Sequence, residues 1–94
     1  MQSVITVPKE SVGHEAFVSA DVLTSWQEVE KRKYNLQKAV TLGNLYRHKV
    51  SITYFLQARE ARRVVTTVWA VTEKYVTLKG GRNIPIRAIS DIEL

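Results

Sequence analysis

Hydrophobic residues recur at helical spacing in the first half of the chain. Between residues 21 and 42, apolar side chains fall within about 80° of one another when each residue turns the chain by about 100°. This pattern predicts an amphipathic helix over 21–42 with an apolar face of Val22, Trp26, Val29, Leu36 and Val40. Gly43, followed by Asn44, predicts a left-handed C-cap. The residues before the helix show no sustained period, so we expect 1–20 to form an extended arm and loop.

After residue 44 the pattern changes from a helical period to a period of two. Val50, Ile52, Tyr54 and Leu56 share one phase, which predicts a half-buried strand over 46–56. Turn residues divide the rest of the chain into further expected strands at 62–72, 75–79, 84–86 and 89–94. The strand at 62–72 carries apolar residues in both phases, so we expect it to be covered on both faces or bent through a bulge.

This order of elements resembles a known architecture. One helix, two long strands and three short strands occur in the Sm-like branch of the SH3-like small barrels, and residues 26–94 resemble that fold. The segment 87–92, Arg-Ala-Ile-Ser-Asp-Ile, is similar to the closing strand of the bacterial Sm-like RNA chaperones. The resemblance implies an α+β fold, in which an N-terminal helix packs on a five-strand antiparallel SH3-like (Sm-like) small barrel over 45–94. It also implies that the last two strands pair between subunits.

The chain departs from the Sm pattern at the positions that contact bases in that family. Thr72 to Tyr75 occupy the turn where Sm proteins carry an aspartate and an asparagine, and Ile86-Arg87 replaces the basic pair before the last strand. The resemblance therefore implies the fold without sequence-specific RNA recognition.

Length and composition place the chain among ordinary globular proteins. Its 94 residues predict a single domain, 1–94, and 45% of them are hydrophobic. Because the sequence contains no cysteine, it predicts no disulfides and fits a reducing compartment, so we expect a cytoplasmic protein. The first residues lack the basic segment and the long apolar run of a signal peptide or membrane span, and we expect no membrane association.

The positive charge is concentrated in the second half of the chain. Residues 1–42 carry five basic and five acidic side chains, whereas residues 43–94 carry nine basic and four acidic ones, so the second half holds the whole net charge of +5. A rigid surface of one charge sign attracts polyanions. Phe55 and Tyr75 lie out of phase with the buried residues of their strands and could stack on bases. Trp26 and Trp69 are expected in the core.

These observations predict a nucleic-acid-binding face on the barrel for RNA or single-stranded DNA. The residues expected to form it are Arg47, Lys49, Phe55, Arg62, Arg63, Tyr75, Lys79 and Arg82. The competing interpretation is an ordinary solvated surface on a protein-interaction or self-assembling module, which would use exposed strand edges and form a homo-oligomer through its last two strands.

No other pattern in the sequence indicates a catalytic, metal-binding or phosphate-binding site. His48 has no His, Asp or Glu at a spacing that would complete a metal site. Asp91 and Glu93 share one face of the last expected strand, where acidic residues commonly keep an edge strand soluble. Gly80-Gly81 lacks the helix and the lysine of a phosphate-binding loop. We therefore expect no catalytic residue, metal, cofactor or small-molecule substrate, and a non-enzymatic binding module.

Overall fold

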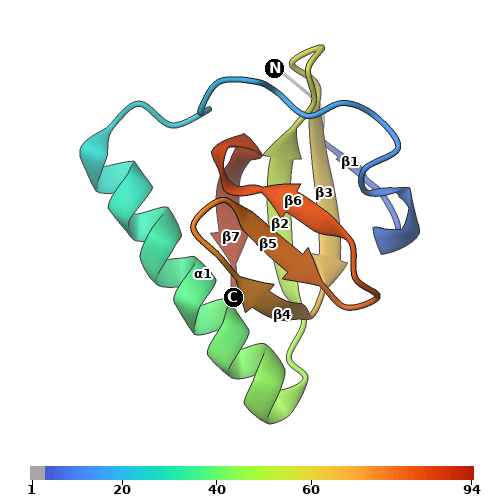
Figure 1. Cartoon of the computed structure of the whole chain (residues 1–94), viewed down its shortest axis with the longest axis vertical. Coiled ribbons are helices and arrows are strands. Elements are labelled where there is room, and N and C mark those ends of the chain that lie inside the picture. The colour runs from blue at the N-terminus through green and yellow to red at the C-terminus, as the bar shows by residue number, and fades with distance from the viewer. Residues whose placement is uncertain (1–3) are drawn as a thin grey trace.

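The computed structural model describes residues 4–94 as one α-helix beside two β-sheets (Figure 1). The chain also forms two short 3₁₀ helices, η1 and η2. The elements in chain order are β1 (Ile5–Thr6), η1 (Lys9–Ser11), α1 (Trp26–Tyr46), β2 (Val50–Phe55), β3 (Ala61–Thr66), β4 (Val68–Val71), β5 (Tyr75–Leu78), β6 (Asn83–Pro85), η2 (Ile86–Ala88) and β7 (Ile89–Glu93).

The two sheets and the helix enclose one hydrophobic core. The first sheet has the strand order β1-β3-β2-β7, in which β1 runs parallel to β3 and the other pairs are antiparallel. The second sheet has the order β4-β5-β6 and is antiparallel throughout. The alternation predicted over 46–56 is present in β2, where Val50, Ile52 and Tyr54 are buried and the residues between them are half-buried. Their partners in the core include Val68, Val76, Leu78, Ile84 and Ile89.

The closed five-strand barrel expected for residues 45–94 is wrong. The expected strand 62–72 divides at the buried Thr67, so β3 stays in the first sheet while β4 enters the second. At the other junction η2 separates β6 from β7, and each of these strands pairs within its own sheet. Hydrogen-bonded ladders therefore do not close into a barrel within residues 4–94. The helix is also not N-terminal, because β1 and η1 precede it and β1 adds a strand to the first sheet.

The buried face of α1 matches the predicted one in part, because Leu36 is buried and Val40 packs against the core, but Trp26 does not. Trp26 is 72% exposed, whereas Arg32, Leu36, Ala39 and Gly43 are the buried residues of the helix. Small side chains at the last two positions allow α1 to approach β4 closely. Trp26, at the opposite end of the helix, lies outside the buried face.

The end of α1 also lies beyond its predicted position. The helix continues through Gly43 to Tyr46, and Arg47 forms the left-handed C-cap with a φ of 53°. Gly43 is instead required for packing, because a Cβ placed there would lie 2.4 Å from the carbonyl oxygen of Val68. At the other end, the Ser25 hydroxyl accepts a hydrogen bond from the Glu28 amide and caps the first turn of the helix.

The segment before α1 is built into the core. It crosses one end of the sheets to reach the helix (Figure 1), and Val12 and Val18 are buried along its course. Backbone hydrogen bonds fix its second half, from the Val18 amide to the Phe55 carbonyl and from the Val22 amide to the Arg87 carbonyl. Residues predicted as an arm and loop therefore cover the core.

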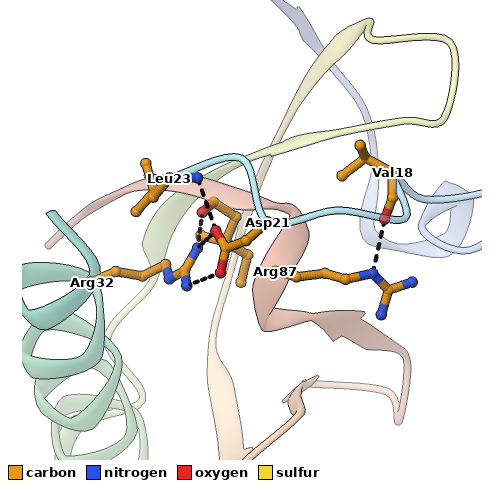
Figure 2. A network of polar contacts seen from close by, with 6 residues as sticks. Val18, Asp21, Leu23, Arg32 and Arg87 are labelled. Atoms are coloured by element: carbon orange, nitrogen blue, oxygen red, sulfur yellow. Dashed lines mark hydrogen bonds and ion pairs between the residues drawn. The ribbon is translucent and has the colours of Figure 1, made fainter. Parts of the chain in front are cut away.

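An ion pair connects this segment to α1 and β7 (Figure 2). The buried Arg32 guanidinium donates to both carboxylate oxygens of Asp21, at 2.9 and 2.8 Å, and to the Ile89 carbonyl at 2.9 Å. The Asp21 carboxylate also accepts from the Leu23 amide. The Arg32 hydrogen bond holds the pKa of Asp21 below its ordinary value, against the opposing effect of partial burial. The contact therefore joins three parts of the chain through one charged group.

Candidate nucleic-acid interface

Three of the predicted basic residues meet at the C-terminal end of α1. Arg47, Lys49 and Lys79 line a cleft of about 420 Å³ together with Trp69, and the rest of its lining is Gly43, Asn44 and Thr67. The cleft lies where the connection from α1 to β2 passes the start of β4 and the end of β5. No aspartate or glutamate is among these lining residues, so the charge facing the cleft is of one sign.

A β-bulge places Trp69 in this cleft. In the β4–β5 ladder Val68 pairs with Leu78 and Ala70 with Thr77, so Trp69 is the extra residue at a shift in register. A bulge bends its strand and re-aims the side chain that it carries. Val68 is fully buried, whereas Trp69 is 49% exposed. The indole therefore presents part of its surface to solvent on a backbone that is fixed by its neighbours.

Thr67 joins the backbone on the two sides of the cleft. Its side-chain hydroxyl donates to the Arg47 carbonyl at 3.4 Å, and its own carbonyl accepts from the Lys79 amide at 2.9 Å. The Arg47 amide in turn donates to the Gly43 carbonyl at 2.9 Å. The backbone that carries two of the three cations is thus held in place, which lowers the entropy cost of binding a ligand there.

Other predicted basic residues are used within the fold. Arg62 bonds to Glu60 at 2.8 Å and lies 4.0 Å from Glu15, and its side chain is largely buried. Arg82 donates to the Val12 carbonyl at 3.1 Å. Arg63 lies within β3, half-buried between its partner strands β1 and β2. The contacts of Arg62 and Arg82 take up guanidinium donors that the predicted face would have offered to phosphates.

The two aromatic residues predicted to stack on bases lie outside the cleft. Phe55 is half-buried, packs against the hydrophobic core and lines a different cavity, beside Val22 and Arg59. Tyr75 is 45% exposed on β5, where it pairs with Pro85. The aromatic residue that accompanies the cations is Trp69, which was predicted to be in the core.

The sequence contained one signal for this placement. Apolar residues occur in both phases between 62 and 72, and this pattern predicts either a doubly covered strand or a bulge. In the structure this strand is interrupted at Thr67 and has a bulge at Trp69, which agrees with the second of these alternatives. Asn44 and Thr67, which complete the cleft, were not among the predicted site residues and carry no comparable signal.

A larger groove of about 550 Å³ lies between α1 and the β4–β5 connection. Its lining is mainly apolar and includes Leu36 and Val71, and its charged residues include both Lys33 and Glu73. Because these two charges have opposite signs, the groove lacks the uniform positive potential of the smaller cleft. The residues around Trp69 are therefore the better candidate for an anionic ligand.

The chain matches no protein-family model, and no curated protein or solved structure matches it. None of the helices within residues 4–94 combines the length and the apolar content needed to cross a lipid bilayer.

Proposed function

We propose that this protein is a non-enzymatic module that binds single-stranded RNA or DNA in the cleft around Trp69. In this proposal Arg47, Lys49 and Lys79 contact phosphates and the exposed part of the indole stacks on a base. The observation that carries the proposal is the convergence of these three cations, with no carboxylate in the lining, around an indole that a bulge turns outward. Cationic grooves with aromatic platforms are the usual means by which proteins hold single strands without reading their sequence.

The number of cations in the cleft limits how strongly salt should affect binding. Each phosphate contact on a single strand contributes about −0.7 to the slope of log affinity against log salt. Three contacts give a slope of about −2, which corresponds to a loss of about 20-fold between 50 and 200 mM salt. A slope near zero would contradict the proposal, because the positive charge would then take no part in binding.

Removing the indole should weaken binding by about tenfold. Loss of one base–aromatic stack costs about 1.5 kcal/mol, and Trp69→Ala leaves the three cations in place. Fluorescence anisotropy of a labelled mixed-sequence 12-mer at 50 mM salt measures the effect. Trp26→Ala is the matched control, because Trp26 is 72% exposed on α1 and does not line the cleft. An equal loss in both variants, or no loss in either, would remove Trp69 from the site.

Arg47→Gly should weaken oligonucleotide binding while leaving the stability of the fold nearly unchanged. Arg47 holds a φ of 53°, a left-handed conformation that glycine adopts without the steric cost that an L side chain meets. We expect the free energy of unfolding to stay within about 0.5 kcal/mol of the wild type, because this relief offsets the greater backbone entropy of glycine in the unfolded chain. Binding should fall several-fold, because one of three phosphate contacts is lost. Urea denaturation and the anisotropy titration test both parts, and unchanged affinity would exclude Arg47 from the interface.

Several expectations from the sequence remain predictions. Among these are a cytoplasmic location, the lack of catalytic, metal and cofactor sites, and self-association through the last two strands. β6 and β7 are the terminal strands of their sheets, so each has an outer edge. Part of the β7 edge is occupied, because Arg32 bonds to the Ile89 carbonyl. Light scattering of the 10.7 kDa chain measures whether copies associate.

A further inference from the structure

A second group of cations lies next to the cleft, at the turn between β5 and β6. Lys79, which lines the cleft, is followed by Gly80 and Gly81 and then by Arg82. The side chain of Lys9, from η1, lies against this turn, because a Cβ placed on Gly80 would lie 3.6 Å from Lys9 Cε. The structure therefore brings a residue from the start of the chain beside the end of β5, which the sequence did not predict.

The turn itself leaves its backbone accessible. Gly80 and Gly81 have φ values of 96° and 92°, which L side chains rarely adopt. No atom outside the turn lies within 4 Å of the position that a Cβ on Gly81 would take. A phosphate could approach this part of the chain without meeting a side chain from the turn. Arg82 is fixed nearby, since its guanidinium donates to the Val12 carbonyl at 3.1 Å.

We propose that a strand bound in the cleft continues over the Gly80-Gly81 turn and places a further phosphate against Lys9. This inference rests on the proposed function and adds the path of the strand. Lys79 lies between the two parts, because it lines the cleft and begins the turn. A ligand that fills only the cleft misses Lys9, whereas a longer strand that follows the turn reaches it.

Glu10 opposes this second contact. Its carboxylate lies 3.8 Å from the Lys9 ammonium. The Glu10 side chain is 70% exposed and the Lys9 side chain is 36% exposed. An exposed ion pair of this kind contributes little to stability, but its carboxylate repels an incoming phosphate. Removing the charge of Glu10 and removing that of Lys9 should therefore change affinity in opposite directions.

The test compares a dinucleotide with a 9-mer of mixed sequence at 50 mM salt. Binding is followed by quenching of Trp69 fluorescence in a Trp26→Phe background, in which Trp69 is the sole tryptophan. Lys9→Ala should weaken binding of the 9-mer roughly 5- to 10-fold, reduce its salt slope by about 0.7, and leave the dinucleotide unchanged. Glu10→Gln should strengthen binding of the 9-mer alone. Lys38→Ala, which removes an exposed lysine from α1, is the control and should change neither ligand.

Two results would overturn the path. One is a 9-mer affinity that Lys9→Ala leaves unchanged, and the other is a loss that is equal for the dinucleotide and the 9-mer. Either result leaves the cleft proposal standing if Trp69→Ala still weakens binding of both ligands; because this variant removes the fluorescent reporter, its binding is measured by the anisotropy of the two labelled ligands. If Trp69→Ala has no effect on either ligand, the proposed function itself fails, and the two failures are thus distinguished.

Discussion

Gly43→Ala should lower the free energy of unfolding by about 3 kcal/mol, although alanine is the better helix former. In an exposed helix the change would stabilise by about 1 kcal/mol. At Gly43 the added methyl group would lie 2.4 Å from the Val68 carbonyl oxygen and 3.0 Å from Thr67 Cγ2. The closer atom belongs to the backbone of β4, so relief requires α1 and β4 to separate, and overpacking of this kind typically costs about 1 to 3 kcal/mol or more.

Urea denaturation of the variant and the wild type measures this difference. Asn44→Ala is the matched control, because Asn44 is the next residue of the same helical turn and is exposed. Its replacement should be neutral or stabilising by a few tenths of a kcal/mol. If Gly43→Ala proved as stable as the wild type, the close approach of α1 to β4 would be wrong. The same separation would displace one wall of the cleft, so we also expect Gly43→Ala to weaken oligonucleotide binding.

Periodicity was sufficient to locate the main elements of the chain. The helix occupies most of the range predicted for it, and the residues predicted to be buried in β2 are buried. These features depend on neighbouring residues, which a sequence pattern records directly. The prediction that Trp26 is buried was wrong for a different reason. The face that α1 buries depends on its close approach to β4, which the small residues Ala39 and Gly43 allow and which a stripe of large apolar residues does not record.

Barrel closure could not be read from the sequence because it depends on two short junctions. Thr67 separates β3 from β4, and residues 86–88 turn as a 3₁₀ helix between β6 and β7. Apolar residues in both phases between 62 and 72 fit a doubly covered strand as well as an interrupted one, so the pattern alone does not decide between them. The parallel pairing of β1 with β3 is a long-range contact between a two-residue strand and the middle of the chain, and two residues carry no period.

The candidate site was partly predictable from charge. Arg47, Lys49 and Lys79 were among the expected residues and lie in one cleft, whereas Arg62 and Arg82 bond to partners within the fold. Basic residues look equivalent in a sequence, and only the fold decides which of them meet a carboxylate or carbonyl. Tryptophan at 69 was assigned to the core because hydrophobicity favours burial, and the register shift in β4 places it otherwise.

Asp21→Asn should destabilise the protein by about 2 kcal/mol at pH 7. The change leaves the Arg32 guanidinium buried with the Ile89 carbonyl and a neutral amide as its partners. Breaking a fully buried ion pair costs about 3 to 5 kcal/mol. The expected loss is smaller here because solvent screens the pair on the Asp21 side. The Asp21 side chain is 40% exposed, whereas the Arg32 side chain is 5% exposed. Asp91→Asn, at an exposed carboxylate of β7, is the control and should be close to neutral.

The contribution of Asp21 should also depend on pH in a defined direction. The Arg32 hydrogen bond lowers the pKa of Asp21 in the folded state below its ordinary value of 3.8, so the unfolded chain binds a proton at higher pH than the folded one. The stabilisation is therefore fully present well above pH 3.8 and is lost as the pH falls through 3.8 toward the folded-state pKa. Urea denaturation of the wild type and Asp21→Asn should give the full difference between pH 5.5 and pH 7 and a shrinking one below about pH 4. A difference that stayed constant down to pH 2.5 would show that the variant acts through packing and not through the charge that Asp21 offers to Arg32.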